Sequence, residues 1–317
     1  MGIKDILRLC NFSDLDNRLI QTLKERGIKR IGVDMYVIFY RFAIDVDIAA
    51  TLVNEPKTFI KHYYERILNF LKKFLNERFE LYLVYEGSKM KYKIVDEERQ
   101  KRREVAKQNG NYISALRIDP QQVYNFEKYI EEYKIPSIIS AHEADAQLAY
   151  MYRQHLIDCV LTNDSDLIVY QVGKIIYIRP DGLKFYESLE VGSDKPTCMN
   201  EVPKEHLFLF GYLIGCDYFK GVPGIGYKKA FEIIKETKRG MNDEELFEDV
   251  YNRIVYKKKE NFLKKLPSKE VLQKMFTLVK YIFNKQCIKD PISGEIKYLD
   301  GKEIVDKEEF GRLEILN

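Results

Sequence analysis

Four short apolar segments of this chain each lead to acidic residues, and this pattern constrains the fold more than any other feature. Segments rich in valine, isoleucine and leucine are typical of strands buried on both faces of a parallel sheet. Ligands of open α/β sheets bind at the carboxyl ends of such strands. Carboxylates gathered there repel one another, so hard divalent cations, which prefer oxygen ligands, are the expected partners. The segments are 31–33, 81–85, 135–139 and 159–162, and the acids after them are Asp34, Glu86, Glu143, Asp145, Asp164 and Asp166.

Alternation of these segments with amphipathic stretches predicts an α/β fold: a central, mostly parallel twisted sheet with helices on both faces. A charged segment, 88–119, is expected to project from this core, and a polar tail is expected from about residue 291. We expect one compact domain overall. Its parts are an N-terminal region at 1–108, an internal region at 120–240 and a helical C-terminal extension with a tail at 241–317.

Composition excludes several classes of protein. No run of eighteen apolar residues is present, so a transmembrane helix is not expected, and the N-terminus does not resemble a secretory signal. The five cysteines are scattered without a Cys-x-x-Cys pair, which favours an intracellular, reducing compartment and argues against a zinc site.

Charge distribution is more informative than the net charge of +3. Between Lys89 and Arg117 there are nine basic and four acidic residues, a local balance of +5. Further basic clusters lie at 220–239 and 257–265. One such cluster is ordinarily a solvated helix face, but three of them around an acidic centre favour a polyanionic partner.

Each acidic pair, taken alone, has an ordinary explanation. Glu143 and Asp145 fit the first turn of a helix, where negative charge is favoured. Asp164 and Asp166 fit a turn after a strand, and also the nucleophile motif of some phosphatases. Asp217 is different, because it ends an apolar helix where the dipole disfavours an acid, and this costly position indicates a function.

Together these motifs resemble the XPG-like, flap-endonuclease family of structure-specific 5′ nucleases. The resemblance covers roughly residues 1–285, and the motifs follow the family's order and approximate spacing. The eukaryotic exonuclease branch is the most similar. The matching stretches are Met1-Gly2-Ile3, Gly-Val-Asp34, Glu143-Ala-Asp145-Ala-Gln-Leu-Ala-Tyr, Thr-Asn-Asp164-Ser-Asp166-Leu, and Gly-Cys-Asp217-Tyr followed by Gly-Ile-Gly.

The resemblance implies a two-metal mechanism with Mg²⁺, for which Mn²⁺ can substitute. Most members of the family have Asp where this chain has Glu86, which keeps the charge but moves the oxygens. The implied ligands are Asp34, Glu86, Glu143 and Asp145 on one side of the site, and Asp164, Asp166 and Asp217 on the other.

The projecting segment resembles a shortened form of the family's helical arch. Lys93 lies seven residues after Glu86, as does the family lysine that reaches the scissile phosphate. Gln100 stands at the spacing of a family arginine, and Arg99 and Arg102 are the nearest substitutes. The alternative for this segment is a charged surface helix. A shortened arch predicts an open site that accepts bubbles or junctions as well as 5′ ends.

Other residues are implied to bind nucleic acid. Tyr36 and Tyr40 lie one helical turn apart, and an aromatic residue in this helix stacks on a terminal base in the family; their alternative role is core packing. The segment 207–238 resembles a helix-two-turn-helix, which often binds K⁺. The remaining candidates for nucleic-acid binding are Gly2, Lys89, Lys101, Arg103, Gly224, Gly226, Lys228 and Lys229.

We therefore expect a metal-dependent nuclease acting on DNA near single-strand/double-strand junctions, as a 5′–3′ exonuclease or flap endonuclease in repair or replication. DNA with flaps, nicks, gaps or free 5′ ends is the expected partner, and the chain is expected to be a monomer, nuclear if it is eukaryotic. An RNA endonuclease of the same fold and a catalytically silent DNA-binding scaffold are the alternatives. No sliding-clamp motif is seen near the C-terminus, and no membrane partner is expected.

Overall fold

A twisted sheet of seven strands forms the centre of the molecule, for which the computed structural model describes residues 2–3, 5–10, 12–14, 18–88, 90, 93, 95–179, 182–188, 201–256 and 263–302. The strand order is β1-β7-β6-β5-β2-β3-β4; the strands from β6 to β4 are parallel, and β7 runs antiparallel to both of its neighbours, β6 and β1. The predicted α/β class with a mostly parallel sheet is confirmed. The strands are β1 (Phe12–Asp14), β2 (Arg30–Asp34), β3 (Glu80–Tyr85), β4 (Ser137–Ile139), β5 (Cys159–Thr162), β6 (Lys174–Arg179) and β7 (Gly182–Glu187).

The register of the parallel strands brings their carboxyl ends to one edge of the sheet. Val33 of β2 is opposite Leu83 of β3 and Leu161 of β5, so the residues after all three strands emerge side by side. β2 and β5 are almost wholly buried, as their apolar sequences predict. β4 differs from the expectation of burial on both faces: it lies at an edge of the sheet, and Ile139 is 60% exposed. An edge strand has a neighbouring strand on one side only, so more of its surface stays exposed.

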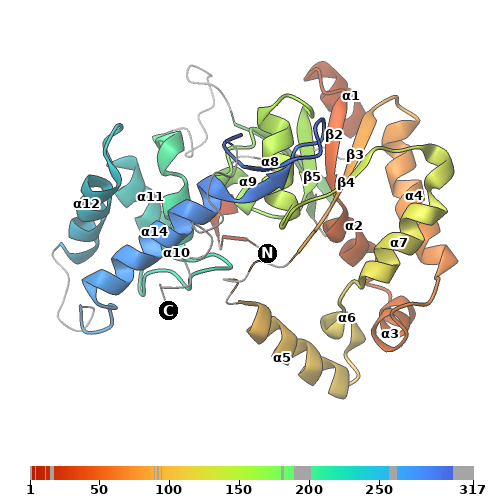
Figure 1. Cartoon of the computed structure of the whole chain (residues 1–317), viewed down its shortest axis with the longest axis horizontal. Coiled ribbons are helices and arrows are strands. Elements are labelled where there is room, and N and C mark those ends of the chain that lie inside the picture. The colour runs from red at the N-terminus through yellow and green to blue at the C-terminus, as the bar shows by residue number, and fades with distance from the viewer. Residues whose placement is uncertain are drawn as a thin grey trace.

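Helices cover both faces of the sheet, and each face has its own apolar core (Figure 1). One core joins the sheet to α1, α2, α3, α4 and α7, and the other joins it to α8 through α12 and α14. Among the described residues, no helix is both long and apolar enough to cross a membrane. The helices on the first face are α1 (Leu19–Glu25), α2 (Met35–Phe42), α3 (Val46–Asn54), α4 (Lys61–Leu75) and α7 (Pro120–Tyr129); those on the second are α8 (Ala144–Arg153), α9 (Asp166–Val169), α10 (Phe208–Ile214), α11 (Tyr227–Lys235), α12 (Asp243–Val255) and α14 (Lys269–Lys285).

The charged segment expected to project does so as two helices, α5 (Val95–Gln108) and α6 (Tyr112–Ala115). Figure 1 shows both helices set apart from the sheet, with α6 beside α3. α5 has almost no apolar residues, so it cannot contribute to a core and remains at the surface. We refer to α5 and α6 as the arch.

The C-terminal extension is not entirely helical, and here the sequence-based prediction was wrong. After α14 the chain forms a two-stranded antiparallel hairpin, β8 (Cys287–Lys289) and β9 (Ile296–Tyr298), where a polar tail was expected from about residue 291. The turn between these strands is polar and exposed, which hides the strand signal. The hairpin packs on α8.

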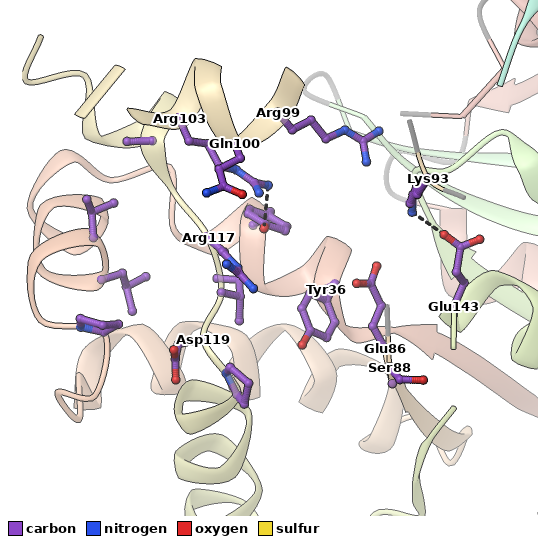
Figure 2. A pocket seen from close by; sticks show the side chains of 18 of the residues that line it. Tyr36, Glu86, Ser88, Lys93, Arg99, Gln100, Arg103, Arg117, Asp119 and Glu143 are labelled. Carbon is purple, nitrogen blue, oxygen red and sulfur yellow. Dashed lines mark hydrogen bonds and ion pairs between the residues drawn. The ribbon is translucent and has the colours of Figure 1, made fainter. Parts of the chain in front are cut away.

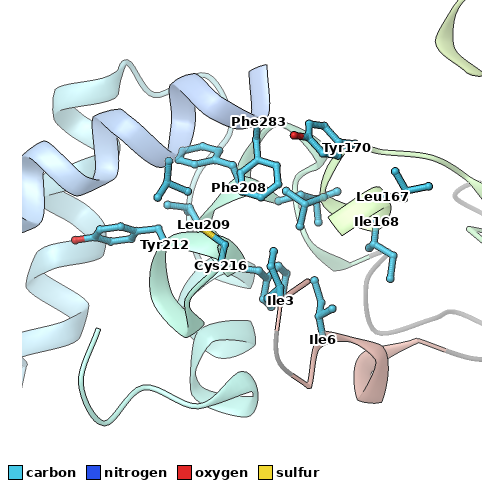
Figure 3. Packing of buried hydrophobic residues seen from close by; sticks show 14 of the residues in the cluster. Ile3, Ile6, Leu167, Ile168, Tyr170, Phe208, Leu209, Tyr212, Cys216 and Phe283 are labelled. Carbon is cyan, nitrogen blue, oxygen red and sulfur yellow. The ribbon is translucent and has the colours of Figure 1, made fainter. Parts of the chain in front are cut away.

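The start of the chain is held in the second core. Ile3 and Ile6, the latter in a 3₁₀ turn at Ile6–Leu9, are buried among residues of α9, α10 and α14 (Figure 3). This packing brings the chain start to the acidic loop after β5.

Candidate active site

Asp34 lies directly at the end of the central strand β2 and is almost completely buried. Its Oδ1 accepts a hydrogen bond from the Val37 amide at 3.3 Å, which caps α2, and its Oδ2 accepts one from the Thr162 hydroxyl at 2.9 Å. The Thr162 oxygen in turn accepts from the Asp164 amide at 3.1 Å. The carboxylate is therefore held between two neighbouring strand ends.

The loop after β5 places Asp164 and Asp166 against the start of the chain. Oδ1 of Asp164 accepts from the Asp166 amide at 3.0 Å, and Oδ1 of Asp166 accepts from the Ile3 amide at 2.8 Å. Gly2 has a φ of +54°, and a Cβ there would lie 2.2 Å from Oδ1 of Asp164. Only glycine fits this contact, so the chain start approaches the acids through its backbone.

Glu86 and Glu143 are brought together by contact between two loops. The Gly87 amide donates to the carbonyl of His142 at 2.7 Å, and a Cβ on Gly87 would lie 1.9 Å from the Ser140 carbonyl oxygen. Glu143 is the N-cap residue of α8, but its side chain makes no capping hydrogen bond. The ordinary capping role considered for Glu143 is therefore not what its side chain does.

Asp217 lies in a tight loop after α10. The Val222 amide donates to the Leu213 carbonyl at 2.9 Å and closes this loop, and a Cβ on Gly221 would lie 2.4 Å from the backbone of Ile214. The loop carries Asp217 beyond the end of α10, away from the helix dipole that the sequence placed it against. Its carboxylate pairs instead with Lys93 and Arg99.

The seven predicted acids act on one another electrostatically. Burial raises the pKa of Asp34 to about 6, and the charge of Asp164 adds to this rise. Desolvation by the surrounding protein raises the pKa of Glu86 to about 7, although part of its surface remains exposed. Burial and the neighbouring carboxylates raise the pKa of Asp145 and of Asp166 well above the usual range. The acids linked in this way are Asp34, Glu86, Glu143, Asp145, Asp164, Asp166 and Asp217.

Two cations of the projecting segment neutralise part of this charge. Lys93 Nζ forms an ion pair with Oε1 of Glu143 and lies 3.3 Å from Oδ2 of Asp217. Arg99 of α5 donates to Oδ1 of Asp217 at 2.8 Å. Burial alone would lower the pKa of Lys93, but the charges of Glu143 and Asp217 outweigh it and raise that pKa. Lys93 thus bridges acids from the two sides of the site, and Arg99 pairs with one of them.

The donor set fits divalent cations. Oδ1 of Asp145 is buried without a hydrogen-bond partner among the described residues, and such an atom is costly unless a ligand satisfies it. Across the described part of the chain, no three acidic, histidine or cysteine side chains converge as a finished metal site. Glu143 and Asp217 are paired with cations instead. Carboxylate oxygens are the ligands that Mg²⁺ prefers.

A cavity of about 600 Å³ opens beside these acids (Figure 2). Glu86, Glu143 and Lys93 form its wall on the sheet side, and Arg99 and Arg103 come from α5 above them. The other five acids are not part of the cavity wall. The cavity has an acidic side and a basic side, which suits a phosphate chain running between them.

Both predicted aromatic residues line this cavity. Tyr36 stands next to Glu86 in Figure 2, and its ring packs edge-on against Phe39. The Tyr40 hydroxyl accepts from Arg103 at 3.4 Å, which connects α2 to the arch. Both tyrosines are half-buried, so neither is a pure core residue.

Some predicted residues lie away from the cavity. Lys101 and Arg102 are exposed on α5 and do not line it, whereas Gln100 does. Lys89 lies outside the described residues. In the segment between α10 and α11, Gly224 has a φ of +77°, while Gly226 is extended and has no neighbour within 4 Å of a Cβ. Lys228 is exposed and Lys229 half-buried on α11.

Several contacting residues were missed at the sequence level. Arg117 lines the cavity but was counted only in the charge balance, although it ends the projecting segment, and Thr162 directly precedes the acidic loop. Tyr218 donates to Oε2 of Glu143 at 2.6 Å, and its place beside Asp217 was the available signal. Gln286 also donates to that oxygen, at 3.0 Å, and nothing in its local sequence indicates this.

Comparison with known proteins agrees with this geometry. The family model of the XPG I-region matches residues 134–217, which include five of the seven acids. Exonuclease 1 of Oryza sativa subsp. japonica is 26% identical over 200 residues, covering 60% of this chain but only 21% of that protein. Flap endonuclease 1 of Methanococcus aeolicus is 28% identical over 271 residues, covering 77% of this chain and 82% of that protein.

Solved structures show the same fold. The catalytic core of Rad2 in complex with DNA substrate superposes with a TM-score of 0.60 at 18% identity, covering 98% of this chain and 94% of that one. The Holliday junction-resolving enzyme GEN1, in complex with product DNA and Mg²⁺, gives 0.55 at 15% identity, covering 99% and 68%. The matched family region and the sequence relatives show that the chain is similar to the XPG and flap-endonuclease family, and to its exonuclease branch.

Proposed function

We propose that this protein is a metal-dependent, structure-specific nuclease that hydrolyses phosphodiester bonds of DNA near single-strand/double-strand junctions with 5′ polarity. The observation that carries the proposal is one arrangement. Six acids that follow the parallel strands and Asp217 after α10 interact electrostatically, and Lys93 and Arg99 of the projecting segment pair with Glu143 and Asp217 beside a cavity. The chain spans about a fifth of the length of the rice Exonuclease 1 that it matches, so the activity stays a proposal.

The acids would hold two divalent ions, Mg²⁺ or Mn²⁺, between the group Asp34, Glu86, Glu143 and Asp145 and the group Asp164, Asp166 and Asp217. Ions bound there supply Lewis-acid chemistry, because they offset phosphate charge and lower the pKa of water. The unpaired oxygen of Asp145 supports this assignment.

Lys93 and Arg99 would stabilise negative charge on the scissile phosphate. Both now pair with carboxylates, at Glu143 and Asp217. A cation that is already held at the site loses little side-chain entropy when a phosphate oxygen takes the place of the carboxylate. Such preorganised charge is the form of stabilisation that lowers an activation barrier most.

The remaining contacts would orient the nucleic acid. Tyr36 or Tyr40 would stack on a terminal base within the cavity, with Arg103 beside it. The backbone at Gly224 and Gly226, with Lys228 and Lys229, would contact duplex phosphates, and K⁺ is proposed to bind at that turn. Gly2, Lys89 and Lys101 complete the proposed contacts. The proposed location is a reducing compartment, and the nucleus if the source is eukaryotic.

Cleavage of matched substrates tests the proposal. A labelled 5′-flap DNA should be cut in Mg²⁺ and left intact in excess chelator. An RNA flap of the same design distinguishes the RNA endonuclease alternative, and tight DNA binding without cleavage would identify a silent scaffold. Strand scission that persists undiminished in chelator would contradict the metal site.

A further inference from the structure

Three residues on one face of α8 contact the C-terminal hairpin. Glu143, Gln147 and Tyr150 are spaced by four and three positions, so they share one side of the helix. Each of them hydrogen-bonds with a residue between Gln286 and Asp290. Glu143 is one of the proposed metal ligands, whereas Gln147 and Tyr150 have no role in the proposed reaction.

Gln147 and Tyr150 hold the hairpin in place. The side-chain amide of Gln147 donates to the carbonyl of Lys289 at 2.7 Å and accepts from its amide at 2.8 Å. It therefore pairs with β8 as a neighbouring strand would. The Tyr150 hydroxyl donates to Oδ2 of Asp290 at 2.9 Å, and Lys297 of β9 lies 3.1 Å from the same oxygen.

Gln286 is held rigidly between α14 and the hairpin. Its side chain is only 1% exposed, and its carbonyl accepts from the Leu299 amide at 2.8 Å. Phe283, one turn earlier, packs its ring 5.0 Å from that of Tyr170, which fixes the end of α14 on the core (Figure 3). The backbone around Gln286 thus has little freedom.

The buried amide of Gln286 is oriented toward Glu143. Its Nε2 donates to Oε2 of Glu143 at 3.0 Å, while its Oε1 is buried with no hydrogen-bond partner within the described residues. An unsatisfied buried oxygen costs stability, so a purely structural role would be served as well by an apolar residue. What glutamine adds at position 286 is therefore the hydrogen bond that it donates to Glu143.

With Tyr218, Gln286 fixes one oxygen of the Glu143 carboxylate. Both donate to Oε2, and Oε1 is left facing Lys93 and the cavity. We propose that Gln286 is a positioning residue that sets the orientation of Glu143 for divalent-cation binding, and that the hairpin, anchored by Gln147 and Tyr150, holds Gln286 at that position. This inference rests on the proposed metal-dependent function.

Cation binding without nucleic acid tests it. Met has nearly the shape of Gln without its donor, so Gln286→Met should weaken Mn²⁺ binding by about 10- to 100-fold, the range for residues that orient metal ligands. Free Mn²⁺ is measured by electron paramagnetic resonance, and folding by circular dichroism. Gln273→Met, at an exposed position of α14, is the matched control and should bind as the wild type does.

A folded Gln286→Met variant that binds Mn²⁺ within about twofold of wild type would overturn the inference and leave the proposed nuclease intact. A wild-type chain that binds no Mn²⁺ would overturn both. If Gln286→Met does not fold, Gln147→Met and Tyr150→Phe decide the question. Each should speed hydrogen exchange in 287–298 and weaken Mn²⁺ binding; faster exchange with unchanged binding would refute the role of the hairpin.

Discussion

At the scale of single residues, Asp166 offers the sharpest test of the acidic site. Asn keeps its shape and its acceptor for the Ile3 amide but removes the charge. We expect Asp166→Asn to slow hydrolysis of a 5′ flap by about a thousandfold or more, equivalent to about 4 kcal/mol of activation free energy. DNA binding should change little, because phosphate contacts are made elsewhere.

Single-turnover rates and binding titrations in Ca²⁺ measure these two effects. Asp243→Asn on the exposed start of α12 is the control, and it should leave the rate unchanged. Wild-type turnover by Asp166→Asn would remove this residue from the site.

The raised pKa of Asp34 predicts how stability depends on pH. Between its ordinary value of 3.8 and about 6, the folded protein binds more protons than the unfolded chain, so the free energy of unfolding falls as pH rises. The full difference corresponds to about 3 kcal/mol. Without metal, Asp34→Asn should therefore raise the melting temperature at pH 8 and have little effect at pH 4.

Thermal unfolding in chelator at the two pH values measures this effect. Because bound cations require ionised carboxylates, Mg²⁺ should stabilise the wild type more at pH 8 than at pH 5. An equal melting temperature of the two proteins at pH 8 would show that Asp34 is not destabilised by its surroundings.

At the scale of elements, α5 directs neighbouring arginines to different environments. Arg99 contacts Asp217, whereas Arg102 is exposed and donates to the Glu98 carbonyl at 3.3 Å. Arg99→Ala should lower the single-turnover rate by about 10- to 100-fold, as expected for loss of one charged transition-state contact. Arg102→Ala, three residues away on the same helix, should stay within about twofold.

This pair separates a phosphate clamp from a charged surface helix. Equal losses of rate in both variants would indicate that α5 attracts DNA by its overall charge. An unchanged rate in both variants would indicate that α5 is only a charged surface helix. Gln100, at the position expected for an arginine, lines the cavity but donates a hydrogen bond to Glu104 at 3.1 Å. Arg99 contacts Asp217, so it is the better substitute for the expected arginine.

At the scale of the whole molecule, the short arch predicts broad substrate use. α5 and α6 have only 14 and 4 residues, so a continuous strand has fewer obstacles than under a longer arch. We expect cleavage of bubbles and four-way junctions in Mg²⁺, in addition to flaps, nicks and gaps. A labelled substrate panel tests this, and strict restriction to free 5′ ends would contradict it.

Much of the site could be predicted because its signals are local. Apolar segments such as 159–162 are typical of buried strands, and parallel strands bring the residues after them to one edge. Asp34, Asp164 and Asp166 were therefore placed together correctly. β4 was misjudged because strand order decides which strand lies at an edge, and the β8–β9 hairpin was missed because its turn is polar.

Local patterns of residues were enough to predict the sheet and to select the acids, since both depend on spacing along a few neighbouring residues. The tertiary structure alone decided that Lys93 and Arg99 meet Asp217 and that Gln286 meets Glu143. Gln286 and Glu143 are 143 positions apart. Contacts at such separations depend on how helices and loops pack around the sheet, and no local pattern of residue types encodes that packing.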